Sequence, residues 1–176
     1  DRSVSRGLGD VYKRQHYYLY DTATGNLKNQ VTDGTWVAGP IAKIDTVRRK
    51  IYFYGYGREK EIDPYYYILY EAQLDRSNTL RLLTSENASH EVSISPSCRY
   101  LVDSYSTVSQ EPVNVVRNRN GKIIMTLEKP DLQPVYEMGW KAPERFKVKA
   151  ADGVTDLYGV MWKPADFDST KVYPII

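Results

Sequence analysis

The chain contains few residues of the types that carry out acid–base or nucleophilic chemistry. Its only histidines are His16 and His90. Hydrolysis by a serine nucleophile needs a hydroxyl beside an imidazole beside a carboxylate, with donors directed at the developing oxyanion. The pattern Gly-x-Ser-x-Gly is absent, and no motif surrounds either histidine. We therefore expect both histidines to lie on the surface or between repeats, and we assign no catalytic residue.

Residues that could bind a metal or an anion are equally sparse. Cys98 is the only cysteine, so neither an intrachain disulfide nor a multi-cysteine metal site can form. It lies in the strand-like run "SISPSCRYLV", where we expect a buried free thiol. Two acidic residues that lie close together in the sequence, Glu59 and Glu61 in "GREKEIDP", are expected in a solvated loop. We predict no metal site and no cofactor.

Charge and hydropathy exclude two classes of partner. The formal net charge is +2, and the excess lies in residues 1–15, so the rest of the chain is balanced and offers no basic stripe for nucleic acid. No segment approaches the ~20 apolar residues that span a bilayer. The sequence therefore predicts neither nucleic-acid binding nor a transmembrane span. No apolar segment typical of a secretory signal lies near the N-terminus.

The first fifteen residues, "DRSVSRGLGDVYKRQ", differ in composition and hydrophobic pattern from the rest of the chain. They are polar and show no helical or strand period, whereas "HYYLYDTATGNL" begins abruptly at His16. The segment resembles translated sequencing-adapter sequence. We therefore expect residues 1–15 to be non-native and exclude them from the fold prediction. A native tail is the alternative.

From His16 onward the sequence predicts short strands separated by turn residues. Sixteen tyrosines against three phenylalanines favour half-buried pleated surfaces. Each predicted strand is bounded by Gly, Asn, Asp, Ser or Pro. The predicted strands are residues 16–22, 27–32, 37–45, 50–57, 65–74, 79–85, 91–97, 100–106, 112–118 and 123–129.

The order of strands and turns recurs. Asp21, Asp75 and Asn118 occupy comparable places, each after a strand and before a turn. A repeat of about 40–50 residues with four strands is typical of a β-propeller blade. Pro96 and Ser97 fit a tight turn inside the last repeat. We predict the outer half of one blade followed by two full blades, with one apolar blade face left unpaired.

The pattern changes after residue 129. A short helical stretch is predicted around Leu132 to Met138. In "RFKVKAADGVTDLYGVMWKP" the spacing then predicts a hairpin, with strands at 146–149 and 157–162 and Asp152-Gly153 in the turn. A further strand is expected to begin at Val172 or Tyr173.

The segment "FKVKAADGVTDLYGVMWKPADFDSTKVYPII" resembles the start of the α/β-hydrolase domain in the prolyl oligopeptidase family of serine peptidases. The preceding "WVAGPIAKIDTVRRKIYFYGYG" and "HEVSISPSCRYLVDSYSTVSQEP" are most similar to the dipeptidyl peptidase IV branch. The resemblance implies a fragment that is all β. Residues 16–129 would be the C-terminal part of a β-propeller, 130–145 a linker, and 146–176 the truncated start of the peptidase domain.

The resemblance also implies a function. The parent protein would be a serine exopeptidase that releases N-terminal dipeptides with Pro or Ala second. Its Ser, Asp and His would lie beyond Ile176 and its substrate-binding residues upstream of His16, so this chain alone is expected to be inactive. The resemblance likewise implies that the parent protein acts on peptide substrates, forms a homodimer and is periplasmic or secreted. Two alternatives remain: a prolyl endopeptidase or acylaminoacyl peptidase of the same family, and a non-catalytic β-propeller that binds proteins.

Overall fold

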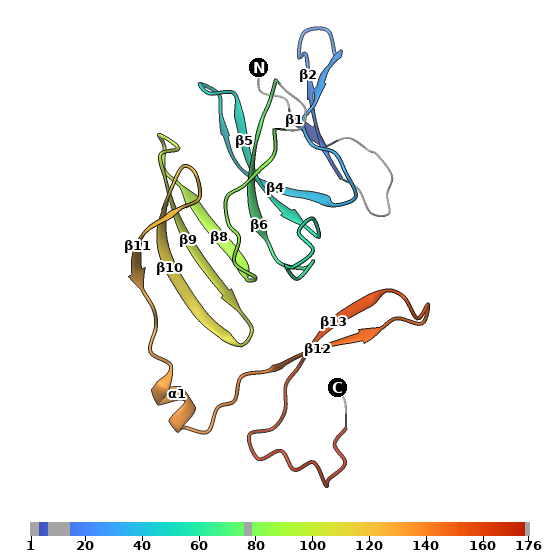
Figure 1. The fold of residues 1–176 in the computed structure, drawn as a ribbon, viewed down its shortest axis with the longest axis vertical. Coiled ribbons are helices and arrows are strands. Elements are labelled where there is room, and N and C mark those ends of the chain that lie inside the picture. Colours follow the sequence, from blue (N-terminus) through green and yellow to red (C-terminus); the bar gives the residue numbers. More distant parts are fainter. Residues whose placement is uncertain (1–3, 7–14, 76–78, 175–176) are drawn as a thin grey trace. The chain divides into compact units, whose positions relative to one another are not determined.

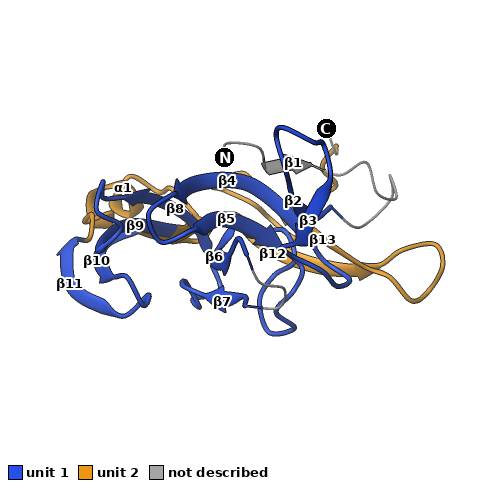
Figure 2. Ribbon diagram, turned by 90° about the horizontal axis from the view of Figure 1, so that it is seen from above, with its two compact units in different colours: residues 1–105, 113–128 blue, residues 106–112, 129–176 orange. Residues whose placement is uncertain are grey.

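The computed structural model describes residues 4–6, 15–75 and 79–174, and these residues form mainly β-structure (Figure 1). They divide into two compact units (Figure 2). Residues 1–105 and 113–128 make up unit 1, and residues 106–112 and 129–176 make up unit 2. Within the described part of the chain, no helix has the length and apolar character needed to cross a membrane.

The repeats form three sheets. The first contains β1 (Val4–Arg6), β2 (Tyr17–Tyr20) and β3 (Leu27–Gln30), in that order. The second sheet consists of β4 (Val37–Asp45), β5 (Lys50–Tyr56), β6 (Ile68–Gln73) and β7 (Arg81–Leu82). The third consists of β8 (Ser89–Ile94), β9 (Tyr100–Thr107), β10 (Gln110–Asn118) and β11 (Ile123–Glu128). Two four-stranded sheets after a partial one confirm the prediction of a partial β-propeller.

Strand β1 lies inside the segment that we expect to be non-native. It pairs antiparallel with β2, with Val4 opposite Leu19 and Arg6 opposite Tyr17. The pairing shows that these three residues can add a strand to the first sheet. It does not test where residues 1–15 come from, and that expectation stays a prediction.

Two apolar clusters hold successive sheets together. The first cluster joins β2 to the second sheet, where Tyr17 packs edge-on against Phe53 and the Phe53 ring stacks on those of Trp36 and Tyr70. The second joins the second and third sheets through Tyr52, Leu69, Leu83, Cys98 and Leu101. Successive residues of one strand therefore face opposite neighbouring sheets, as in stacked propeller blades. Cys98 is buried and free, as predicted.

The same backbone contacts recur in successive repeats. In the first, the Tyr17 N–H donates to Thr32 Oγ1 at 2.9 Å and the Tyr17 carbonyl accepts from Val31. In the second repeat, the Leu69 N–H donates to Thr84 Oγ1 and the Leu69 carbonyl accepts the Leu83 N–H. Each of these residues follows its counterpart in the first repeat by the same number of positions. The turn-opening residues also correspond, because the side-chain oxygens of Asp21 and Asn118 each accept two backbone N–H groups. These contacts confirm the predicted repeat for Asp21 and Asn118, whereas the turn after Asp75, residues 76–78, lies outside the described range.

The outward face of the third sheet carries several exposed apolar side chains. Tyr100 and Val102 of β9 are 46% and 45% exposed, and Met125 of β11 is 58% exposed. The Cα positions of Val116 and Met125 are paired, which places both on one face of the sheet. The predicted unpaired blade face is therefore present.

Unit 2 contains a short helix and a hairpin. Helix α1 (Gln133–Glu137) has a proline in its first turn and is followed by Gly139 at φ 90°. Strands β12 (Glu144–Lys149) and β13 (Asp156–Met161) pair across a turn in which Asp152 Oδ1 accepts from the N–H groups of Val154 and Thr155. The predicted helix and hairpin are both confirmed.

One predicted strand is absent. Residues 171–174 are irregular, so no strand begins at Val172 or Tyr173 within the described range. A strand needs a neighbour to satisfy its backbone N–H and C=O groups. No described strand pairs with this segment, and its last two residues, 175 and 176, lie outside the described range.

Candidate functional site: a buried ionic network

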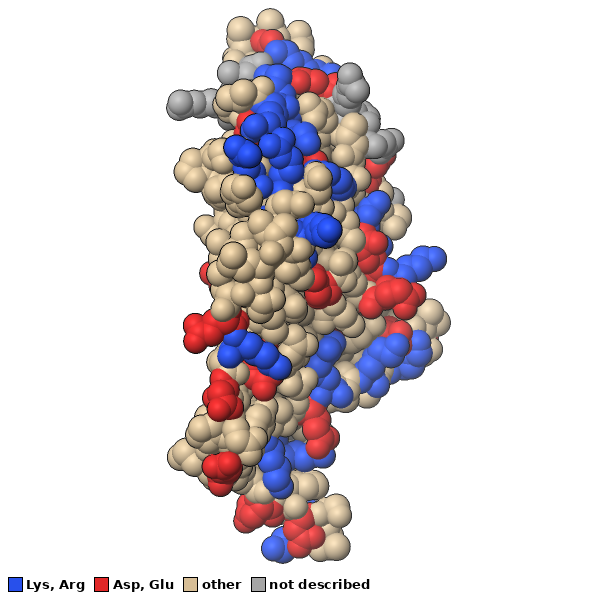
Figure 3. Space-filling model, turned by 60° about the vertical axis from the view of Figure 1, so that its left-hand side comes forward, with Lys and Arg blue, Asp and Glu red and all other residues tan. Residues whose placement is uncertain are grey.

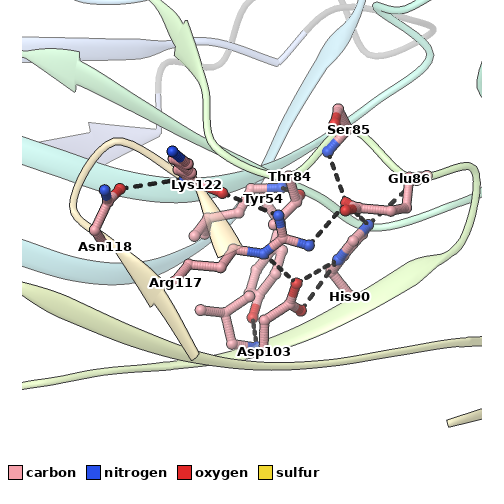
Figure 4. A network of polar contacts seen from close by, with 12 residues as sticks. Tyr54, Thr84, Ser85, Glu86, His90, Asp103, Arg117, Asn118 and Lys122 are labelled. Carbon is pink, nitrogen blue, oxygen red and sulfur yellow. Dashed lines mark hydrogen bonds and ion pairs between the residues drawn. The ribbon is translucent and has the colours of Figure 1, made fainter. Parts of the chain in front are cut away.

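The densest cluster of ionisable groups surrounds His90 at the start of β8 (Figure 4). Its Nδ1 lies 3.0 Å from both carboxylate oxygens of Asp103 on β9, and its Nε2 lies 3.2 Å from the Glu86 carbonyl oxygen. The side chains of His90 and Asp103 are both 0% exposed. The Tyr67 carbonyl accepts the His90 backbone N–H, which fixes the start of β8 next to β6. The imidazole is therefore held on both edges inside the protein.

Arg117 of β10 brings a positive charge to this cluster. Its Nε donates to Asp103 Oδ2 at 2.7 Å, and its Nη2 lies 2.8 Å from Glu86 Oε2. Its Nη1 donates to the Gly121 carbonyl at 3.0 Å. One guanidinium thus joins β9, the turn after β10 and the segment between β7 and β8, as Figure 4 shows. Its 3% exposed side chain makes this a buried salt bridge, whose partners cannot be removed singly without leaving a buried charge.

The network shifts two ionisation equilibria. Burial acts to raise the pKa of Glu86, but the hydrogen bond and charge of Arg117, with the Ser85 N–H, outweigh it and lower that pKa overall. Burial raises the pKa of Tyr105, whose ring lies 5.3 Å from that of His90. Glu86 is therefore held as a carboxylate beside Arg117, and Tyr105 as a neutral phenol.

The arrangement does not fit a metal centre. One ligand atom each from Glu86, His90 and Asp103 lies within 4.8 Å of the others, a spacing that could hold a cation. The Arg117 guanidinium contacts both carboxylates, however, and supplies the positive charge that a metal would bring. Among the described residues we interpret this cluster as an ionic network between sheets. The predicted lack of metal ligands stays a prediction.

The arrangement does not fit a catalytic dyad either. A histidine that activates a nucleophile directs one ring nitrogen to a carboxylate and the other to a hydroxyl or thiol. His90 has the carboxylate, but its Nε2 faces a backbone carbonyl. His16 contacts the Thr32 hydroxyl and the Gly34 carbonyl, and no carboxylate contact joins it among the described residues. Both histidines are buried, so the expected position between repeats is confirmed over the surface alternative.

The preceding sheet has aromatic residues around the start of β4. The indole N–H of Trp36, which precedes β4, donates to the Asp33 carbonyl at 2.6 Å. Its ring packs with Phe53 and Tyr70. The residue that corresponds to His90 in this repeat is Ala38, because the Ala38 N–H donates to the Gln15 carbonyl as the His90 N–H donates to that of Tyr67. A small apolar residue of one repeat is thus replaced by an ionisable one in the next.

The other residues singled out from the sequence do not assemble into a site. Glu59 accepts a hydrogen bond from the Tyr70 hydroxyl at 3.1 Å and also pairs with Arg58, whereas Glu61 is exposed. The residues that sequence reasoning missed are Glu86, Asp103 and Arg117. Asp103 and Arg117 each lie two residues after a buried apolar residue, Leu101 and Val115 respectively. Residues two apart in a strand share a face, so this spacing could have indicated that both are buried.

Charges on the surface are mixed in sign. On the face drawn in Figure 3, Lys and Arg side chains gather toward the top of the view, and they alternate with Asp and Glu side chains below. The predicted lack of nucleic-acid binding is not tested by this distribution and stays a prediction.

Comparison with known proteins agrees with the fold. Human dipeptidyl peptidase 8 is 25% identical over an alignment of 165 residues that covers 83% of this chain, and the mouse protein is 24% identical over the same coverage. A crystal structure of a dipeptidyl aminopeptidase IV candidate from Bacteroides ovatus matches 92% of this chain with a TM-score of 0.65 and 26% identity. The chain spans 17% of the length of the two curated relatives and 25% of the crystallised chain.

A family model matches most of the described sheets. It represents the N-terminal region of dipeptidyl peptidase IV and matches residues 6–112, which include all of β2 to β9. The chain belongs to the dipeptidyl peptidase IV family, within the wider prolyl oligopeptidase family, and contributes part of its N-terminal β-propeller region.

Proposed function

We propose that this chain is part of a serine-type dipeptidyl peptidase. Residues 16–129 would form the last blades of its propeller, residues 130–145 a linker, and residues 146–176 the beginning of the peptidase domain. The family match on residues 6–112 supports the first assignment. The hairpin β12–β13, which follows the repeats, supports the last.

The two faces of this hairpin differ in chemistry. Paired positions place Phe146, Val148, Leu157 and Met161 on one face, with the Phe146 ring lying over Gly159 and Glu144 at the end of the face opposite Met161. On the other face, Lys147 and Lys149 form ion pairs with Asp156. The four apolar side chains are 40–49% exposed. A two-stranded hairpin is marginal alone, so this apolar face is the observation that carries the proposal: it fits the edge of a larger sheet.

The parent protein would release dipeptides from peptide N-termini when Pro or Ala is second. The names of the relatives, dipeptidyl peptidase and dipeptidyl aminopeptidase, support this reaction class. The nucleophilic Ser and the Asp and His of the triad would lie beyond Ile176, and the residues that bind the substrate upstream of His16. The chain alone would be inactive, because its sequence contains no Gly-x-Ser-x-Gly motif and both of its histidines are engaged in buried contacts. A homodimer and a periplasmic or secreted location belong to the same proposal.

The proposal is tested on the full coding sequence that contains this chain. The encoded protein, its variant with the predicted nucleophile Ser replaced by Ala, and the isolated chain are assayed on Xaa-Pro and Xaa-Ala chromogenic amides. We expect release of the chromophore by the intact protein alone.

Blocking the substrate's amino terminus separates the related activities. Loss of cleavage on acetylation of the substrate supports the dipeptidyl peptidase. Cleavage that persists after a proline inside a longer peptide, or release of the acylated residue, would instead identify an endopeptidase or an acylaminoacyl peptidase. No cleavage of any of these substrates would favour a propeller used for protein binding.

A further inference from the structure

Both histidines of the chain are buried, but they face different groups. His16 lies 3.2 Å from the Thr32 hydroxyl through Nδ1 and 3.0 Å from the Gly34 carbonyl through Nε2. His90 faces the Asp103 carboxylate through Nδ1 and the Glu86 carbonyl through Nε2. Hydroxyls donate and accept, whereas carboxylates and carbonyls only accept. The partners therefore prescribe different protonation states.

A neutral imidazole satisfies the contacts of His16. Its Nε2–H can donate to the Gly34 carbonyl, while Nδ1 accepts the hydroxyl proton of Thr32. The Thr32 oxygen accepts the Tyr17 N–H at the same time, which leaves its proton directed to the imidazole. No second ring proton is needed.

A neutral imidazole does not satisfy the contacts of His90. One nitrogen of the neutral ring is a lone-pair acceptor, and in either tautomer that lone pair would face an oxygen acceptor at about hydrogen-bonding distance. Turning the ring over would bring a carbon to the Asp103 carboxylate and lose its best partner. Both nitrogens must therefore carry a proton if both contacts are hydrogen bonds.

The charges around His90 lead to the same conclusion. With a neutral imidazole, Asp103 and Glu86 would share one cation, Arg117, and leave a negative charge inside the protein. With an imidazolium, two anions face two cations and the buried network is neutral. The titratable or charged groups around it come from every element that packs against the ring: Glu86, Glu91, Asp103, Tyr105, Arg117 and Tyr54.

We propose that His90 is an imidazolium in the folded protein, and that its deprotonation loosens the junction between the second and third sheets. The junction depends on this ring, because His90 joins Asp103 of β9 to Glu86 in the segment that leads from β7. Glu86 is 28% exposed at its side chain, so the network is open to solvent protons on that side. The result is a pH-sensitive contact built into the fold.

A charged His90 in the folded protein determines the sign of the pH dependence of stability. An unfolded histidine loses its proton near pH 6.5. Above that pH the folded chain, with His90 still charged, binds one more proton than the unfolded chain, so its free energy of unfolding decreases as pH rises. Below pH 6.5 both states are charged at His90 and this contribution is fully present. The sensitive range therefore begins near neutrality and extends to alkaline pH.

The first test is a long-range ¹H–¹⁵N spectrum of the full chain with labelled histidine at pH 8. We expect two protonated nitrogens in the His90 ring and one in the His16 ring, with signals assigned by His90→Gln and His16→Gln. The wild-type measurement does not depend on the folding of any variant. A neutral tautomer at His90 at this pH would overturn the proposal.

The second test compares urea unfolding from pH 7.5 to 9, above the range in which an unfolded histidine takes up a proton. We expect the wild type and His16→Gln to lose stability in parallel as pH rises, and His90→Gln to show a flatter dependence over the same range. If all three proteins show the same slope, deprotonation of His90 does not loosen the junction and the proposal fails.

Discussion

The backbone of Gly121, in the turn between β10 and β11, lies directly against the carbonyl group of Leu83. A Cβ at position 121 would lie 2.2 Å from the Leu83 oxygen, and the glycine has a φ of 84°. We expect Gly121→Ala to destabilise the chain by roughly 1–2 kcal/mol through the left-handed conformation alone. Displacement of the Leu83 backbone adds to this cost. Urea unfolding followed by circular dichroism measures the total.

Gly153 provides the matched control for that substitution. It also has positive φ, at 68°, but an added Cβ would meet no atom within 4 Å. Gly153→Ala should therefore show only the conformational cost. Equal losses in the two variants would mean that the contact between Gly121 and Leu83 contributes nothing.

Arg117→Leu should be strongly destabilising. The substitution leaves the carboxylates of Asp103 and Glu86 without their guanidinium partner, and Asp103 is fully buried. Breaking a buried ion pair on one side costs about 3–5 kcal/mol. Arg49→Leu removes an exposed pair with Asp75 and should cost at most about 1 kcal/mol. Similar midpoints of urea unfolding for the two variants would contradict the structural role of the network.

The equivalent threonines of the two repeats should both be needed for stability, and Thr32→Val should cost more because it also removes the hydroxyl that contacts His16 Nδ1. Thr84→Val and Thr32→Val each remove the hydroxyl that accepts a buried backbone N–H, from Leu69 and Tyr17 respectively. A buried donor left without its partner costs about 1–3 kcal/mol. The exposed Thr46→Val serves as the control in thermal unfolding. A stable Thr84→Val protein would show that another group satisfies the Leu69 N–H.

Acid should weaken the network through Glu86. Its pKa is lowered in the folded protein, so its contribution is present above the unfolded value, about 4.3, and is lost as pH falls through the folded value. Glu86→Gln should lower stability at pH 6 and flatten its decline in acid. Glu61→Gln, at an exposed position, should leave both unchanged. Unfolding midpoints between pH 3 and 6 check this expectation, and a Glu86→Gln curve parallel to the wild type would contradict it.

The strands were predictable where alternation and turn chemistry agree. Residues 37–45 form β4 with the predicted bounds, and Asp21 and Asn118 open turns as expected. The predicted strand 79–85 shortens to β7, of two residues. The Thr84 hydroxyl, instead of a strand carbonyl, accepts the Leu69 N–H and ends regular pairing there. Thr32 ends β3 in the same way, a side-chain effect that β propensity does not contain.

The ionic network was not predictable from local sequence. Asp103 and Arg117 are separated by 14 positions, and their contact depends on how β9 and β10 pair. Hydrophobic alternation indicates which face each residue occupies, but not whether a buried polar residue will meet a partner of opposite charge. The partner Glu86 lies in a connecting segment that no strand pattern describes.

The single guanidinium of Arg117 also constrains the order of folding events. Its contacts reach Glu86, Asp103 and Gly121, which lie in three separate segments. The contacts of Arg117 with Glu86 and Asp103 join residues far apart in the sequence, so each requires the chain between them to close a loop first. They can form only after β9 and β10 have paired and the segment after β7 has packed beside them. Substitutions at Arg117 should therefore accelerate unfolding while leaving the refolding rate nearly unchanged. In kinetic terms, this residue closes the junction after the sheets have formed, and it delays their separation.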